Sequence, residues 1–422
     1  MNLAVIFTTG HADTLGNACR LEMIAFLNRH FTTTVYTNVP EFLEKHLPDA
    51  EIRSIGNVLT ITTPTGKNSA ASNAFADNQG AGNPSAVNLS GRTISGSNSL
   101  FRQLTSFRKL AAIINRSAAD ALFMFHDTSA VALWMKKPVF QYVHQYGRRT
   151  RQNGSFLRRQ LRNASALIRE RWTLGGMARS KMNFVVSEPI SDLLRNRGVG
   201  KLHTTPHALD LSKFREPLET ALHSPLKSLK KQGFFVASYT GWMMESRGFH
   251  LMLEALRMAV QRDGKIVLAL AGTDAVHAEK LRDFAEKHGL QEHIVDFGIV
   301  DSSLTPGILA NSDLCLSYLD DLPAFHLSPP QKIIEYFASG KAVICNRIQT
   351  HNLVKNGYNG LVTEYDPGQL AESILTLKND PDLLAELSAN ALKSASQFDA
   401  ETLYGELVQI MKSAVTPREK TA

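Results

Sequence analysis

The chain has 422 residues, of which 43% are hydrophobic, enough for two or three domains with cores of their own, so disorder of the whole chain is excluded. Its 46 basic and 39 acidic residues leave a formal charge of +7, too small an excess for a dedicated nucleic-acid binder, and we expect no nucleic-acid partner. The charge is uneven, because residues 1–210 carry 25 basic and 13 acidic residues, net +12, and the remainder 21 and 26, net −5. The two halves therefore face different partners.

The cysteines and the N-terminus indicate the compartment. Cys19, Cys315 and Cys345 lie far apart and outside CxxC spacing, which favours neither disulfides nor a zinc site. The first apolar run, Leu3 to Phe7, is too short for a signal peptide and is typical of a buried strand. No segment approaches the roughly 18 apolar residues of a membrane span. We expect a cytoplasmic protein whose contact with the inner face of the cytoplasmic membrane would be peripheral.

Apolar runs alternate with helical patterns in the first half, which predicts an α/β fold. Leu3 to Phe7, a helix over 13–30 and a strand at Thr32 to Thr37 form a βαβ opening. Later apolar runs continue the pattern expected of a parallel sheet covered by helices; they are Ala121 to Phe125, Pro138 to Val143 and Met182 to Val186.

Residues 67–99 interrupt this alternation. Of these 33 residues, 17 are Ser, Asn or Gly, and few are bulky and apolar, so the segment cannot build a core. Asn recurs every five residues from Asn68 to Asn88, as in a pentapeptide solenoid, but only Asn88-Leu89 supplies the Leu such coils stack inside. We interpret the segment as a mobile loop.

The stretch Arg148 to Lys181 is basic and amphipathic. It carries nine arginines, one lysine and a single acid, Glu170, among apolar residues at helical spacing. It is either a solvated helix face or a docking surface for an anionic membrane or a phosphorylated acceptor.

A connector with several prolines, which we place at 208–232, separates the halves. We expect an N-terminal domain at 1–207, a C-terminal domain at 233–400, and a helix at 401–422 that returns to the first domain with a tail. Residues 248–260 have apolar positions on one helical face. Six strands are predicted in the second half: Phe234 to Tyr239, Lys265 to Ala271, Ile294 to Phe297, Leu314 to Tyr318, Ala342 to Cys345 and Leu361 to Glu364. The fold class is therefore α/β, with two Rossmann-like doubly wound domains whose ligands gather in a central cleft.

The segment from Ser328 to Gly340 is the most informative. Simple nicotinamide, P-loop, zincin and α/β-hydrolase motifs are missing from the chain. Ser328 and Gln331 have capping-box spacing and Pro329 suits the first helical position, so a helix start with phosphate-binding amides is predicted here. Glu335, one turn on, could accept hydrogen bonds from a ribose diol, although Lys332 and Glu335 also have the spacing of a surface ion pair.

This segment, continued through Gly340-Lys-Ala-Val-Ile344, resembles the nucleotide-sugar segment of retaining GT-B glycosyltransferases, particularly glycosyltransferase family 4. Three further segments carry the resemblance, which is good from about Phe184 to Met411 and weaker before. They are Phe184 to Leu194 with Pro206 to Phe214, Tyr239 to Trp242 with Arg247-Gly248, and Asn356 to Val362.

The resemblance implies the site residues. Glu335 would bind the donor ribose, and the backbone amides around Ser328, Pro329, Pro330 and Gln331, with Lys332, would lie at the phosphates. Gly10 would let the acceptor-side loop approach the sugar phosphate, Gly241 would belong to the donor site, and Ile299, Val300 and Asp301 would flank the base. Arg247 would stabilise the diphosphate, and His144 would lie beside the transferred sugar, with His126 as a second histidine of the cleft. No metal or other cofactor is implied.

The implied function is transfer of a hexose-type sugar from UDP or GDP to a glycan or lipid-linked acceptor, in the synthesis of cell-surface polysaccharide or lipopolysaccharide. Two positions depart from the family pattern: Trp242 stands where an arginine is usual, and Leu327 where an acidic residue often lies. A sugar-nucleotide-binding scaffold without catalysis therefore stays open, as does another GT-B enzyme such as a sugar-nucleotide epimerase.

Overall fold

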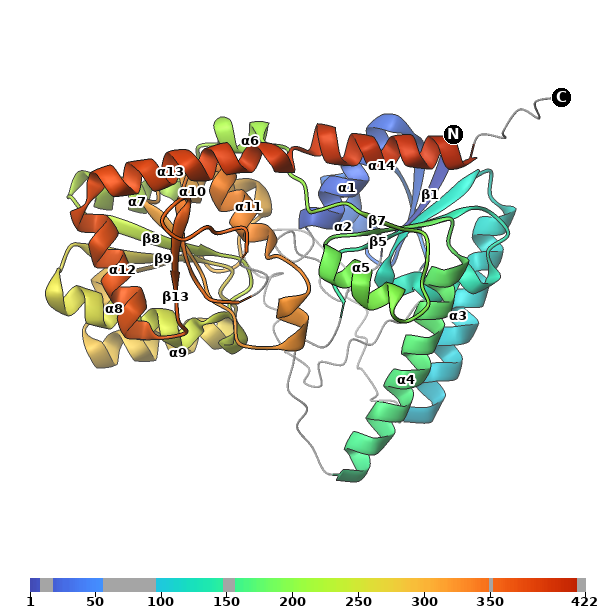
Figure 1. Cartoon of the computed structure of the whole chain (residues 1–422), viewed down its shortest axis with the longest axis horizontal. Helices are drawn as coiled ribbons and strands as arrows, with labels where there is room; N and C mark the ends of the chain where they lie inside the picture. The colour runs from blue at the N-terminus through green and yellow to red at the C-terminus, as the bar shows by residue number, and fades with distance from the viewer. Residues whose placement is uncertain (8–17, 56–95, 147–155, 349–351, 416–422) are drawn as a thin grey trace, which may run out of the picture.

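A computed structural model describes residues 1–7, 18–55, 96–146, 156–348 and 352–415. Each half of the chain builds one sheet in which all the strands run parallel (Figure 1). The first sheet has seven strands in the order β3-β2-β1-β4-β5-β6-β7. Its strands are β1 (Asn2–Phe7), β2 (Thr32–Thr37), β3 (Glu51–Ser54), β4 (Ala121–Phe125), β5 (Val139–Val143), β6 (Met182–Val185) and β7 (Leu202–Thr204).

The second sheet has six strands in the order β10-β9-β8-β11-β12-β13. They are β8 (Phe235–Thr240), β9 (Ile266–Ala271), β10 (Ile294–Asp296), β11 (Leu314–Ser317), β12 (Ala342–Asn346) and β13 (Gly360–Thr363). In both sheets the strand order reverses beside the first strand, between β1 and β4 and between β8 and β11. These are the topological switch points at which doubly wound sheets bind ligands.

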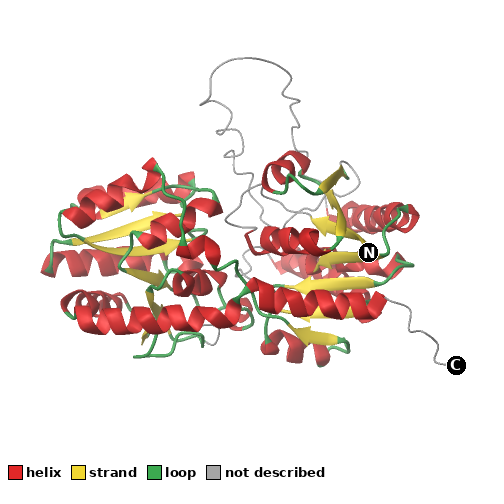
Figure 2. Ribbon diagram, turned by 90° about the horizontal axis from the view of Figure 1, so that it is seen from above, coloured by secondary structure: helices red, strands yellow, loops and turns green. Residues whose placement is uncertain are grey.

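Helices cover both faces of each sheet (Figure 2). In chain order they are α1 (Ala18–His30), α2 (Pro40–His46), α3 (Gly96–Arg116), α4 (Phe156–Arg179), α5 (Glu188–Arg195), α6 (Ser212–Arg215), α7 (Ser224–Lys231), α8 (Phe249–Arg262), α9 (Ala275–His288), α10 (Thr305–Ala310), α11 (Gln331–Ala338), α12 (Pro367–Asn379), α13 (Pro381–Ala395) and α14 (Ala400–Val415).

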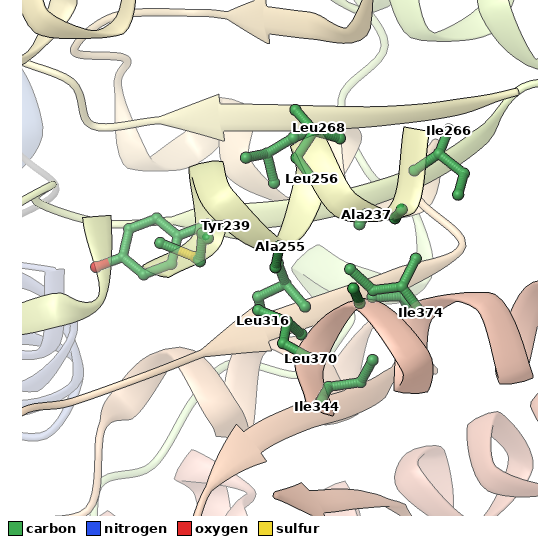
Figure 3. Packing of buried hydrophobic residues seen from close by; sticks show 14 of the residues in the cluster. Ala237, Tyr239, Ala255, Leu256, Ile266, Leu268, Leu316, Ile344, Leu370 and Ile374 are labelled. Carbon is green, nitrogen blue, oxygen red and sulfur yellow. The ribbon is translucent and has the colours of Figure 1, made fainter. Parts of the chain in front are cut away.

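The core of the C-terminal domain shows how the apolar patterns become packing. Ala255 and Leu256 of α8 pack with Leu268 of β9, and Leu370 and Ile374 of α12 belong to the same buried cluster (Figure 3). All five side chains are at most 3% exposed. Burial of apolar surface contributes about 25 cal/mol per Å², so these helix faces hold α8 and α12 on the sheet.

The last helix, α14, returns to the N-terminal domain as expected. Tyr404, Leu407, Val408 and Met411 are buried in one cluster with residues of β1, β4 and α1. The hydroxyl of Tyr404 donates to the carbonyl of Ala208 at 3.3 Å and accepts from its amide at 3.2 Å. Figure 1 shows α13 on one domain and α14 on the other along the same side of the molecule.

Three details differ from the sequence-based expectations. The edge strands β3 and β7 were not predicted, because they are short and only partly apolar. The segment 67–99 is not loop to its end, since α3 begins at Gly96; Gly, Ser and Asn are tolerated in a first helical turn, whose amides lack helical partners. Residues 67–95 lie outside the described part of the chain. The connector also contains α7, whose Leu226 is buried with Val236 in the C-terminal domain.

Candidate functional site

The residues with the strongest signs of function lie at the switch point of the second sheet. Gly241 and Trp242 directly follow β8, and α11 begins after the loop that leaves β11. The backbones of the β8, β9 and β10 ends are tied together there: Gly241 N–H donates to Ala271 O at 2.8 Å, and Gly272 N–H donates to Gly298 O at 2.6 Å. The carboxyl ends of these strands therefore form one fixed edge.

Lys332, in the first turn of α11, is buried at this edge. The residue is 7% exposed, and its Nζ has no hydrogen-bond partner among the described residues. The ammonium lies 3.4 Å from the ring centroid of Tyr239, a cation–π contact. Burial, reinforced by the charge of Arg247, holds the pKa of Lys332 well below its usual value. A surface ion pair with Glu335 is therefore not what the structure shows.

Gly241 makes room for this ammonium. Its φ is +106°, a conformation that favours glycine, and a Cβ atom there would lie 3.2 Å from Lys332 Nζ. The close approach at Gly241 is thus an approach to Lys332. A ligand placed over Gly241 would meet backbone and a buried cation together.

Arg247 adds a second positive charge. It follows the loop after β8, and its guanidinium interacts with the hydroxyl of Tyr239. Its buried Nε has no hydrogen-bond partner among the residues that the structure describes. Burial raises the pKa of Tyr239, and the charge of Arg247 opposes that shift. Tyr239 therefore carries one cation on its ring and another at its hydroxyl.

Glu335 lies one turn further along α11. Its Oε1 accepts a hydrogen bond from Gln331 Nε2 at 3.1 Å. Burial, followed by the charge of Glu22 from the other domain, raises the pKa of Glu335 to about 7, while Lys332 and Gln331 oppose the shift. A carboxyl in this state changes its protonation with small changes of environment.

The start of α11 differs from the predicted capping box. The helix begins at Gln331 with Pro330 as its N-cap, and no side chain caps it. Pro329 lies before the helix and not at its first position. The φ of proline fits both an extended segment and a first helical turn, so the residue type alone does not fix the helix start. Gln331 turns to Glu335, and the buried Ser328 Oγ has no partner among the described residues. The first amides of α11 are therefore not occupied by a side-chain cap.

The loop after β10 reaches the N-terminal domain. Asp301 Oδ2 lies 3.2 Å from Nε2 of His46, at the end of α2. Burial raises the pKa of Asp301, but hydrogen bonds from Ser303 and His46 outweigh it, so the pKa is lowered. Val300 is 7% exposed and packs in a core cluster, whereas Ile299 is half-buried. Asp301 and Ile299 are thus more accessible than Val300.

Two histidines lie at the carboxyl ends of strands in the first sheet. His144 directly follows β5, and His126 directly follows β4. Their ring centroids are 5.0 Å apart, and His144 also packs edge-on against Phe125 at 6.0 Å. This pair belongs to the N-terminal side, away from the Lys332 cluster in sequence and sheet. Gly10 lies outside the described residues.

Several residues of the site were not predicted. Glu22 of α1 and Lys213 of α6 form an ion pair at 2.7 Å near Glu335, and His46 reaches Asp301. These partners come from distant parts of the chain, and no local pattern marks them. Thr273, with a buried hydroxyl that has no partner among the described residues, had a signal, since it is the second residue after the buried strand β9.

Among the described residues, no group of three or more His, Cys, Asp or Glu side chains is placed to hold a metal ion. Within the same described ranges, no helix is long and apolar enough to cross a membrane.

Solved structures with the same two-domain arrangement show the class of fold. HepE of Anabaena in complex with UDP is 16% identical, covers 98% of this chain and 100% of its own, and superposes with a TM-score of 0.69. Sucrose-phosphate synthase of Thermosynechococcus elongatus is 16% identical, covers 98% of each chain and has a TM-score of 0.68. A glycosyltransferase of Rickettsia africae is 17% identical, covers 99% of each chain and has a TM-score of 0.66. The fold is the GT-B fold of two Rossmann-like domains.

The sequence of the C-terminal domain matches one protein-family model. Residues 234–380 match the family model described as glycosyl transferases group 1. Comparison with the sequences of curated proteins finds no match. Residues 234–380 are therefore similar to a glycosyltransferase group 1 domain, within a chain that has the GT-B fold.

Proposed function

We propose that this chain is a retaining glycosyltransferase that moves a hexose-type sugar from a nucleoside diphosphate, UDP or GDP, to a hydroxyl of a glycan or lipid-linked acceptor. The observation that carries the proposal is the pair of cations at the end of β8. Lys332 Nζ and Arg247 Nε are both buried, and neither atom has a hydrogen-bond partner among the described residues. Burying charge is costly unless it is compensated, so the binding of an anion beside these two cations is favoured.

A diphosphate fits this pair. It carries two negative charges, and the uncapped amides at the start of α11 add donors and the positive end of a helix dipole. Glu335, one turn on, is placed for the ribose hydroxyls. UDP and UDP-glucose bound to HepE, a structural neighbour, agree in chemistry with such a ligand.

The chemistry needs stabilisation of the leaving group. As the bond between the sugar C1 and the diphosphate oxygen breaks, negative charge grows on the diphosphate, where Lys332 and Arg247 stabilise it. The acceptor oxygen forms the new bond to C1 on the same face, and its proton passes to the leaving phosphate oxygen. Each well-placed donor in comparable sites contributes about 2 to 4 kcal/mol. His144 orients the sugar from the N-terminal side, and the reaction needs no metal.

The acceptor side is the basic N-terminal domain, and we propose that α4 brings it to an anionic membrane surface inside the cell. Leu167 is 65% and Ile168 43% exposed on this helix. Its single acid, Glu170, is paired with Arg197, so the surface stays basic. Apolar side chains among arginines favour binding to anionic lipid. Flotation with anionic vesicles tests this: salt-sensitive binding that Leu167→Ser weakens is expected, and no binding contradicts it.

The experiment for the main proposal is transfer itself. The protein is incubated with UDP- and GDP-sugars and a panel of glycan acceptors, and NMR of the product reports its anomeric configuration. We expect retention, with turnover lost in Arg247→Ala and Glu335→Ala. Binding of nucleotide without turnover or hydrolysis would favour a non-catalytic scaffold, and a new sugar nucleotide formed without acceptor would favour an epimerase. Either result contradicts the proposal.

A further inference from the structure

Glu22 is a carboxyl group of the N-terminal domain that the reaction described above does not use. The opposite face of its helix, with Ile24 and Leu27, is buried in the domain core. The Glu22 side chain is 16% exposed and turns to the boundary between the domains. In Figure 1, α1 and α11 lie on either side of that boundary. The charge of Glu22 acts on Glu335 across it.

One oxygen of Glu22 is fixed and the other is left over. Lys213 of the connector helix α6 donates to Oε1 at 2.7 Å. Oε2 is buried and has no hydrogen-bond partner among the described residues. Burial, with a smaller contribution from the charge of Asp210, raises the pKa of Glu22, while Lys213 and a hydrogen bond from the Asp210 backbone oppose the shift. A buried acceptor without a donor is costly, so a ligand that brings a donor is favoured here.

The carboxyl groups of Glu22 and Glu335 come from different domains and are close enough to repel each other. Charge repulsion from Glu22 contributes to the raised pKa of Glu335, about 7. A proton, a cation or a neutral hydrogen-bond donor relieves such repulsion. Next to Glu335, the buried ammonium of Lys332 lacks a hydrogen-bond partner among the described residues, so a bound anion would stabilise it. A ligand that carries both an anion and neutral hydroxyls, about 4.5 Å apart for three residues of helix, meets both needs.

We propose that Glu22 forms the second wall of the ribose pocket: its Oε2 accepts a hydrogen bond from one hydroxyl of the donor ribose, whose other hydroxyl bonds to Glu335. The inference rests on the proposed function, because it takes the ligand to be a nucleoside diphosphate. It adds that the N-terminal domain binds the nucleotide directly. Donor binding then joins α1 to α11 and holds the two domains together.

Lys213 acts as a positioning residue in this arrangement. It is 54% exposed on its side chain and can be replaced with little effect on folding. It leaves Glu22 with one oriented free oxygen. Loss of Lys213 is therefore expected to weaken the ribose contact without removing it.

The test measures how the affinity for the nucleotide changes when one ribose hydroxyl, one carboxyl side chain, or both are removed. Whichever of UDP and GDP binds more tightly to the unmodified protein is titrated by calorimetry beside its 2′-deoxy and 3′-deoxy analogues. We expect each missing hydroxyl to lower affinity about tenfold. In Glu22→Ala, affinity for the complete nucleotide falls about tenfold, and one of the two deoxy analogues binds as well as the complete nucleotide. Glu335→Ala does the same for the other analogue.

Three further variants sharpen the result. Glu22→Gln keeps a hydrogen-bond acceptor and is expected to retain most of the preference for the complete nucleotide over the deoxy analogue. Lys213→Met is expected to lose part of this preference. Glu401→Gln removes an exposed carboxylate of α14 that pairs with Arg29 of α1, the helix of Glu22, and this control should match the unmodified protein.

Glu22→Ala with unchanged discrimination at both hydroxyls overturns the inference, while loss of discrimination in Glu335→Ala would leave the proposed function standing. Stabilisation by Mg²⁺ alone that disappears in Glu22→Ala, without a change in discrimination, assigns the carboxyl pair to a cation and also overturns it. An unmodified protein that binds neither nucleotide contradicts the proposed function first, and the ribose assignment with it.

Discussion

The ammonium of Lys332 lies 3.4 Å above the ring of Tyr239, in a part of the molecule where the charge of Arg247 also acts on it. An aromatic ring compensates a buried cation only in part, by about 2 kcal/mol when desolvated. The rest of the free energy of burying this charge lowers the stability of the protein until a ligand supplies negative charge. Strain of this kind is typical of binding sites.

Replacement of Lys332 by methionine is therefore expected to stabilise the free protein. Methionine fills a similar volume, keeps a contact with the Tyr239 ring and needs no counter-charge. We expect a gain of about 1 kcal/mol or more, measured as a rise in midpoint of thermal unfolding without nucleotide. Lys227→Met, at an exposed lysine paired with Glu219, is the control and should be neutral. A lower midpoint for Lys332→Met would show that the ammonium stabilises the free fold.

Glu335→Gln tests the raised pKa of the carboxyl. Between its ordinary pKa of 4.5 and the raised pKa of about 7, Glu335 holds a proton in the native protein that the unfolded chain releases, so this group lowers stability as pH rises across that range. The full cost, at most about 3 kcal/mol, is present above pH 7. Glu335→Gln should therefore match the parent in unfolding free energy near pH 4.5 and exceed it at about pH 8. Equal pH profiles for both proteins would contradict a perturbed Glu335.

Nucleotide binding should change the protonation of Lys332. Its pKa is lowered in the free protein, and a bound diphosphate favours the ammonium, so binding takes up a proton where Lys332 is neutral. Glu335→Gln removes any change in protonation of the Glu335 carboxyl, which would otherwise offset the proton uptake by Lys332. Calorimetry of this variant with UDP in two buffers of different ionisation enthalpy is expected to show uptake at about pH 8. The same titration should show no uptake after Lys332→Met is added; persistent uptake would place the proton elsewhere.

Gly241→Ala should weaken nucleotide binding beyond its effect on stability. The new Cβ lies 3.2 Å from Lys332 Nζ and must displace the ammonium, in addition to straining φ at +106°. Gly233→Ala is a matched control, since Gly233 also has positive φ, +79°, with open space around it. Both should lose about 1 kcal/mol of stability. Only Gly241→Ala should lower UDP affinity, by about tenfold or more; equal affinities would remove Gly241 from the site.

The order of elements was predictable because both sheets are built from buried parallel strands. β2 and β4 coincide with their apolar runs, and β8, β9, β11 and β12 differ by one residue or two at their ends. The edge strand β3, Glu51–Ser54, escaped prediction because one face is exposed and only Ile52 is a bulky apolar residue. Periodicity reports burial, so a strand with little burial carries little signal.

The site was predictable only where its residues lie together in the chain. Ser328 to Glu335 and Gly241 to Arg247 are short segments, and Lys332, Gly241 and Arg247 meet at the end of β8. The burial of Lys332 and the contacts of Glu22 with Lys213 depend on how the domains and the connector pack. The capping box failed because Gln331 bonds to Glu335 instead of the Ser328 backbone, a choice that local spacing does not decide.

The most direct test of the account is a calorimetric titration with UDP and GDP in the presence of a metal chelator. We expect one of them to bind with micromolar affinity, about −8 kcal/mol, and the double variant Arg247→Ala/Lys332→Met to bind at least about a hundredfold more weakly. Equal affinity in the parent and the double variant, or no binding of either nucleotide to the parent, would contradict a diphosphate site at these two cations.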